Sequence, residues 1–164
     1  MKPCIPLMIL PLLLASCGED TTTPRIGQPA SVHDYYSATV TSYGVAEIAN
    51  GQKSDGTTET FQRNDYRYVI LGITVCGNQS DKTHHILDQD DFKLAENTRI
   101  DSLRKKPIPD YRWIGLEIGP STKENITLAF EVTVRSLDTY QYLEIDFTKA
   151  PGNAFIKLTD PISD

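Results

Sequence analysis

The chain has 164 residues and a formal net charge of −6, from 16 Lys and Arg residues against 22 Asp and Glu residues. This length is typical of one domain and is sufficient to bury a hydrophobic core. Nucleic-acid phosphates require a basic protein surface, so the acidic balance argues against a nucleic-acid partner.

The first 16 residues have the features of an export signal. Lys2 provides a basic start, and an apolar run extends over residues 5–14. The run is shorter than the roughly 20 apolar residues that span a bilayer. A basic start, a short apolar segment and the small residues Ala15 and Ser16 are together typical of a secretory signal peptide over residues 1–16.

The stretch Leu14-Ala15-Ser16-Cys17 resembles the lipobox of bacterial lipoproteins, in which the cysteine is acylated and becomes the mature N-terminus. The resemblance implies lipidation of Cys17 and a location in the cell envelope, outside the cytoplasm. Several acyl chains on one cysteine make membrane attachment effectively permanent. Gly18 replaces the aspartate that commonly retains Gram-negative lipoproteins in the inner membrane, so the outer membrane is expected in a Gram-negative cell. The alternative is an ordinary cleaved signal with an incidental Cys17.

Residues 17–33 are expected to form the acylated cysteine and a flexible tether. The segment is rich in threonine, proline and glycine and offers too little apolar surface to pack. The folded domain is therefore expected over residues 34–164.

From residue 34 onward the apolar residues recur with a period of two, which predicts β-strands. Tyr36, Ala38 and Val40 alternate with small polar residues and predict a first strand. Residues 50–58 contain Asn-Gly and Asp-Gly dipeptides, which are typical of turns, and are expected to form a loop.

The clearest strand is expected over residues 66–76. Alternation directs one set of its side chains to the core, namely Val69, Leu71, Ile73 and Val75. The other set is expected to face outward, namely Tyr68, Ile70, Gly72, Thr74 and Cys76.

Further strands are expected over residues 91–95, 125–134 and 141–147, and a last strand over residues 155–158. Their inward side chains are expected to be Phe92, Leu94, Ile126, Leu128, Phe130, Val132, Leu143, Ile145 and Phe147. No segment shows a long helical period. Many short strands separated by turns predict an all-β sandwich or barrel.

Three of these strands carry a family resemblance, through residues 68–75 followed by Asn78, then Asp91-Phe92-Lys93-Leu94, then Phe130-Glu131-Val132. Here the chain resembles bacterial lipoprotein domains of unknown function with a telokin-like immunoglobulin fold, related to a secreted mycobacterial immunoprotective antigen. The resemblance implies one immunoglobulin-like antiparallel β-sandwich. The chain departs from the pattern in the Gly-Pro order at residues 119–120 and in the long segment 102–113. The family's biochemical function is mostly unknown, so the resemblance implies no chemistry.

Candidate metal ligands occur at His84, His85, Asp88 and Asp90, because imidazoles and carboxylates bind divalent metals. Neighbouring residues of a strand point to opposite faces, so the two histidines cannot both face one ion if extended. The calcium-loop pattern also fails, since its glycine is missing. We therefore expect a solvated acidic loop and no cofactor, with a capping role for Asp91.

The run Arg104, Lys105 and Lys106 is a candidate binding site for anionic head groups or a cell-surface polymer. Each basic residue near such a surface contributes about 1 kcal/mol of attraction. Three charges on a loop are more often simply solvated, which is the alternative.

Cys76 is the one thiol left once Cys4 is removed with the signal and Cys17 is acylated, so no intramolecular disulfide is expected. Nothing in the sequence lowers its pKa toward that of a nucleophile, and no Gly-x-Ser-x-Gly motif is present. We expect a covered, unreactive thiol and no enzymatic activity.

The sequence therefore predicts a membrane-anchored, non-enzymatic domain that binds another envelope component, with a protein as the favoured partner. A metal- or cysteine-dependent envelope enzyme and an inhibitor of a secreted protease are the alternatives. Tyrosine pairs predict either a partner-binding face or cross-strand aromatic pairs. These residues are Tyr35, Tyr36, Tyr66, Tyr68, Tyr140 and Tyr142.

Overall fold

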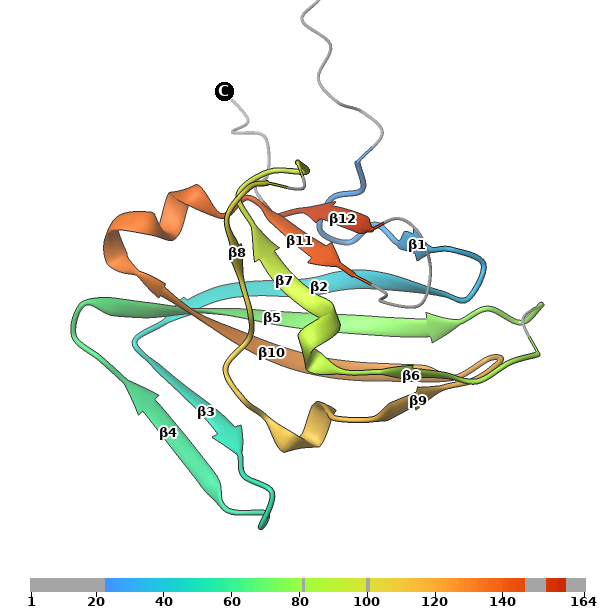
Figure 1. The fold of residues 1–164 in the computed structure, drawn as a ribbon, viewed down its shortest axis with the longest axis horizontal. Helices are drawn as coiled ribbons and strands as arrows, with labels where there is room; N and C mark the ends of the chain where they lie inside the picture. The colour runs from blue at the N-terminus through green and yellow to red at the C-terminus, as the bar shows by residue number, and fades with distance from the viewer. Residues whose placement is uncertain (1–22, 81, 100, 147–152, 159–164) are drawn as a thin grey trace, which may run out of the picture.

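The computed structural model describes residues 23–80, 82–99, 101–146 and 153–158. Two four-stranded antiparallel sheets face each other across one hydrophobic core, which confirms the predicted immunoglobulin-like antiparallel β-sandwich (Figure 1). The first sheet has the strand order β1 (Ala30–Val32), β2 (Tyr36–Ala46), β5 (Tyr66–Gly77) and β10 (Lys123–Thr133). The second has the order β12 (Ala154–Lys157), β11 (Tyr142–Ile145), β7 (Phe92–Ala95) and β8 (Arg104–Lys105).

Two short two-stranded sheets and three 3₁₀ helices complete the described chain. The two-stranded sheets are β3 (Ile48–Gln52) with β4 (Thr58–Gln62), and β6 (His85–Leu87) with β9 (Leu116–Ile118). The helices are η1 (Gln89–Asp91), η2 (Tyr111–Trp113) and η3 (Val134–Thr139).

The predicted phase of the main strands is confirmed. In β5 the four inward side chains are at most 2% exposed, and Ile73 lies between Val40 of β2 and Ile126 of β10. The predicted inward residues of β7, β10 and β11 are buried in the same cluster, whereas Phe147 lies outside the described residues. Alternation alone thus located the core, because each sheet buries one face against the other.

The outward face of β5 is only partly exposed, which the sequence did not predict. Tyr68 is fully buried there, in a small second cluster with Ala49 and Ile108. Its hydroxyl donates to Glu131 Oε2 at 3.1 Å. The β3–β4 hairpin and residue 108 cover this part of the sheet, so both faces of the first sheet are buried at that position.

The predicted loop over residues 50–58 is wrong over much of its length, because Asn50-Gly51 lies inside β3 and only residues 53–57 form the turn. A Cβ at Gly51 would collide with the backbone oxygen of Pro109. The glycine therefore serves a close approach between two backbones rather than a turn.

The domain begins earlier than the expected boundary at residue 34. Ala30 and Val32 are buried in β1, which pairs with β2. Upstream, Lys157 N donates to Pro24 O at 2.7 Å, so the chain before β1 also lies against β12. Residues 17–22 of the expected tether lie outside the described residues, as do the signal segment and Cys17.

The strand expected from residue 91 begins at Phe92, because Asp91 ends η1. Its carboxylate accepts a hydrogen bond from Asp88 N at 2.7 Å, so Asp91 has the expected capping role.

Candidate protein-interaction surface

The candidate metal ligands do not converge. His84 Nδ1 lies 2.5 Å from Glu117 Oε1, on the exposed surface. His85 instead stacks on Tyr35, with ring centroids 4.2 Å apart, and its Nε2 lies 2.9 Å from Thr83 Oγ1. The two imidazoles therefore have different partners in different directions.

The two candidate carboxylates are engaged elsewhere as well. Asp88 accepts a hydrogen bond from Gly115 N, and Asp90 forms an exposed ion pair with Lys106 at 3.0 Å. Among the residues that the structure describes, no group of three or more His, Cys, Asp or Glu side chains could hold a metal ion. The acidic segment is held by protein partners rather than gathered into a metal site.

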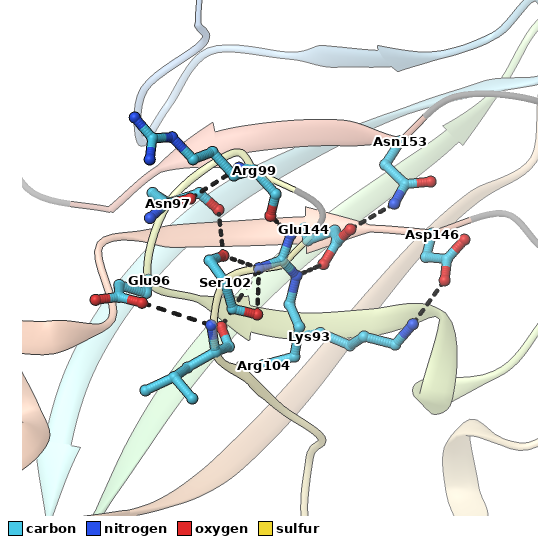
Figure 2. A network of polar contacts seen from close by, with 10 residues as sticks. Lys93, Glu96, Asn97, Arg99, Ser102, Arg104, Glu144, Asp146 and Asn153 are labelled. Atoms are coloured by element: carbon cyan, nitrogen blue, oxygen red, sulfur yellow. Dashed lines mark hydrogen bonds and ion pairs between the residues drawn. The ribbon is translucent and has the colours of Figure 1, made fainter.

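The basic run is not a loop with three free charges. Arg104 and Lys105 form β8 at the edge of the second sheet, and Lys106 is the partner of Asp90. The Arg104 side chain is only 18% exposed and its guanidinium is directed inward onto Glu144 (Figure 2). Arg104 is thus a structural residue and does not offer its charge to a ligand.

Figure 2 shows how this ion pair organises its surroundings. Glu144, on β11, is 5% exposed and accepts hydrogen bonds from Arg104 and from Asn153. The guanidinium also donates to the carbonyl oxygens of Ser102 at 3.1 Å and Arg99 at 2.7 Å. The network fastens the segment between β7 and β8 to the second sheet.

Cys76 is a free, half-buried thiol at the end of β5, in agreement with the expected partly covered position. It lines an open cleft of about 400 Å³ together with His33 and Tyr36. His84 and His85 are not among the residues that line this cleft, and both are engaged with other residues. The imidazole in this cleft belongs to His33, so the cleft places neither of the candidate metal ligands His84 and His85 beside the thiol.

The tyrosine stretches do not form an exposed face either. Tyr36, Tyr68 and Tyr140 are buried, and the other members of the three pairs are only half-buried. These residues contribute mainly to the two hydrophobic clusters.

A surface with the composition of a binding site is present on η2 and the residue after it. Tyr111 and Ile114 are 51% and 50% exposed. Between them, the Arg112 guanidinium lies 5.5 Å from the ring centroid of Trp113, which is half-buried against the core. Tyrosine, tryptophan and arginine dominate the residues that contribute most to protein–protein affinity. We refer to residues 111–114 as the η2 surface.

Buried Asp110 holds the start of the η2 surface. Its carboxylate accepts hydrogen bonds from Arg112 Nε at 2.9 and 3.1 Å and from Gln52 N at 3.3 Å. Its backbone N–H donates to Gln89 Oε1 at 2.9 Å. Burial raises the pKa of Asp110, but the hydrogen bonds and charge of Arg112 outweigh burial and hold the pKa below its ordinary value.

The end of the η2 surface is held by Gly115. This residue has φ of +69°, a conformation that favours glycine, and its N–H donates to Asp88. With both ends fixed, little backbone order remains to be gained on binding, which lowers the entropic cost of an interface.

Sequence reasoning missed this surface. In the sequence, residues 102–113 stand out only as a departure from the family pattern, and the tyrosine pairs lie at other positions. The available signal was compositional, since Tyr-Arg-Trp-Ile follows two prolines in a segment with no strand period. Its exposure depends on Asp110, whose partners Gln52 and Gln89 are distant in sequence.

The Asp110 geometry predicts a pH-dependent stability. A carboxyl whose pKa is lower in the folded chain stabilises the fold above pH of about 4 and loses this contribution as pH falls through the lowered pKa. Asp110→Asn is therefore expected to lower the free energy of unfolding by about 1–3 kcal/mol at neutral pH, with a smaller difference in strong acid. Urea titrations at both pH values measure this. The control Asp90→Asn alters the exposed ion pair with Lys106 and should change the free energy of unfolding little. If Asp110→Asn lowered the free energy of unfolding equally at both pH values, the ionic role of Asp110 would be contradicted.

Comparisons with known proteins give a fold and no family. No protein-family model matches the chain, and no curated protein matches it. The yjhA protein from Bacillus subtilis has a similar structure, with a TM-score of 0.54 and 14% sequence identity over 84% of this chain and 100% of that chain. An uncharacterized β-sandwich protein from Clostridium difficile 630 matches with a TM-score of 0.48 and 9% identity, over 87% of this chain and 98% of its own.

The Bacillus subtilis protein is similar to this chain in its fold, and at 14% identity the likeness concerns the fold alone. Within the described ranges, no helix has the length and apolar character needed to cross a membrane.

Proposed function

We propose that this chain is an envelope lipoprotein, anchored through acylated Cys17, whose β-sandwich binds another envelope protein through the η2 surface and has no catalytic role. The observation that carries the binding function is the exposed, preorganised Tyr111–Ile114 segment. The anchor is supported by the Leu14-Ala15-Ser16-Cys17 motif. In a Gram-negative cell the outer membrane is the proposed location.

The arrangement of the domain suits this function. The described chain begins beside β12, where Pro24 accepts a hydrogen bond from Lys157, whereas η2 and the β3–β4 hairpin lie at the opposite end of the domain (Figure 1). An anchor attached before residue 23 would leave the η2 surface directed away from its own membrane. A partner could then reach this surface without competing with lipid.

We also propose membership of the telokin-like lipoprotein domains that are related to the mycobacterial antigen. Most motif residues of the resemblance fall on β5, β7 and β10, which pair or pack around the core, whereas Asn78 follows β5 and Asp91 ends η1. The Bacillus subtilis structure supports the fold that such membership implies.

The anchor is tested by Cys17→Ser. Without the acylated cysteine the chain should accumulate as uncleaved precursor or as a soluble exported form, because only the acyl chains would hold the processed protein at the membrane. Fractionation with alkaline extraction and comparison of gel mobility measure this. Retention in the membrane fraction at unchanged mobility, with resistance to alkali, would contradict lipid anchoring.

Binding is tested by crosslinking intact envelopes that contain the full-length chain and then measuring the affinity for the captured protein. The double variant Tyr111→Ala, Ile114→Ala is expected to lose at least about 2 kcal/mol of binding free energy, roughly 30-fold in affinity. Leu103→Ala removes an equally exposed apolar side chain outside the η2 surface and should leave affinity unchanged. Equal losses in both variants would argue against this surface, and a secreted protease as the captured protein would favour the inhibitor alternative.

A further inference from the structure

The second half of β2 is an open sheet edge. β1 pairs with β2 only at residues 36–38, and the carbonyl of Val40 accepts a hydrogen bond from Gly27 N at 2.9 Å. Beyond that point, no strand among the described residues pairs with residues 41–46 on the side away from β5. We refer to this segment as the β2 edge.

The register shows which backbone groups face outward. The Val40 carbonyl points away from β5. Ile73 of β5, which lies opposite Val40, therefore forms no backbone hydrogen bond with β2. Leu71 and Val69 lie two and four positions before Ile73 in β5, so their backbone groups have the same orientation as those of Ile73. They lie opposite Tyr43 and Val45, respectively. The N–H and C=O groups of Tyr43 and Val45 are therefore directed to the open side. No backbone partner for them occurs in the described part of the chain.

The side chains of the β2 edge are suited to contact with another strand. Tyr43 and Val45 are 44% and 47% exposed and lie on one face, with Gly44 between them. The segment 41–46 contains no charged residue and no proline, which are the usual means of preventing edge-to-edge association.

Among the described residues, the other edges of the two four-stranded sheets are partly covered or charged. On β10, Ala129 O accepts a hydrogen bond from Ile108 N at 2.7 Å, and on β12, Lys157 N donates to Pro24 O at 2.7 Å. The edge strand β8 is short and consists of Arg104 and Lys105. The β2 edge, by contrast, is uncharged and has no backbone partner at Tyr43 and Val45 among the described residues.

We propose that the β2 edge pairs antiparallel with the β2 edge of a second copy of this chain, about a two-fold axis at Gly44. In this register Tyr43 of each copy lies opposite Val45 of the other, and each such pair exchanges two backbone hydrogen bonds. The first sheet then continues from one copy into the next. The surface is separate from η2, and the pairing does not require a lipid anchor.

A second copy fits this edge for two reasons. Tyrosine opposite valine is a favourable aromatic–β-branched pair on a sheet, and the register forms this pair twice. The register also sets Glu47 opposite Thr41 of the other copy, so no like charges face each other, and Glu47 is already paired with Arg67 at 3.2 Å. The same patch serves both copies, so the contact closes as a dimer instead of growing into a fibre.

The register is tested by disulfide trapping with the full-length chain. In the proposed pair the two Gly44 Cα atoms are about 4.5 Å apart, within the range for a disulfide. Nothing lies within 4 Å of the position that a Cβ at Gly44 would occupy, so Gly44→Cys is sterically tolerated. Mild oxidation should convert most Gly44→Cys chains to a dimer that collapses on reduction. Wild-type chain and Thr58→Cys, an exposed position on the β3–β4 hairpin, should give only traces.

A second experiment removes the backbone N–H of Val45, which is directed to the open side of β2. Val45→Pro deletes an N–H that does not bond to β5, so a cooperative melting transition should persist while the Gly44→Cys dimer is lost; Val45→Thr keeps the N–H and should keep the dimer. A Gly44→Cys chain that stays monomeric would overturn the proposal. Three other results would also overturn the proposal. These are trapping of Thr58→Cys to the same extent, a Gly44→Cys dimer that persists with Val45→Pro, and a crosslink from Gly44→Cys to a different protein.

Discussion

Ile73→Asp is expected to abolish folding of the domain. Ile73 is 1% exposed in the centre of β5, between Val40 and Ile126, and faces the second sheet. The variant loses a buried aliphatic side chain, which alone costs about 2–5 kcal/mol on truncation, and introduces a carboxylate without a partner. Folded domains typically have a free energy of unfolding of about 5–15 kcal/mol. The combined loss is therefore comparable with the entire stability of the domain. Far-UV circular dichroism and a urea titration should show no cooperative transition.

Thr74→Asp is the matched control, because Thr74 is the next residue and faces the other side of β5. It is half-buried, and its hydroxyl donates to Asn125 Oδ1 at 2.7 Å. The substitution should cost about 1 kcal/mol, as is typical for partly exposed positions. Equal damage from both variants would mean that this part of the first sheet is buried as deeply on its outer face as on its inner face.

Arg104→Ala is expected to lower the free energy of unfolding by about 3–5 kcal/mol, since it leaves a buried carboxylate without its counter-charge. Glu144 is 5% exposed, and after the substitution Asn153 is the one side chain among the described residues that still hydrogen-bonds to it (Figure 2). The carbonyl oxygens of Ser102 and Arg99 also lose their donor, so the segment before β8 is released. Urea titration measures the loss, and proteolysis should become faster within residues 96–104.

Two further variants separate charge from packing. The double variant Arg104→Met, Glu144→Leu removes both charges and is expected to be close to wild type or more stable, because the desolvation cost of the pair disappears. Lys106→Ala breaks the exposed Lys106–Asp90 pair, whose side chains are 64% and 57% exposed, and should cost at most about 1 kcal/mol. A double variant as unstable as Arg104→Ala would show that the ion pair itself, rather than the unpaired charge, determines the stability.

Strand positions and their phase followed from the sequence alone. A period of two in β5, β7, β10 and β11 identifies the inward face, since a one-residue slip would move every apolar side chain to solvent. The capping role of Asp91 and the half-covered position of Cys76 also depend on local pattern, and both predictions agree with the structure. The lipobox is a similarly local signal, and lipidation of Cys17 stays a prediction.

The tertiary structure decided what covers each surface and which charges are free. Tyr68 is on the outward face of β5 as predicted, yet it is buried because Ala49 of the β3–β4 hairpin and Ile108 of a later segment pack against it. Arg104 belongs to a basic run, yet its charge is neutralised by Glu144, 40 residues further along the chain. The η2 surface and the β2 edge depend equally on distant segments, through Asp110 with Gln52 and through the short reach of β1. Periodicity specifies the direction of a side chain along its own strand, whereas exposure and pairing depend on contacts between segments that no local pattern encodes.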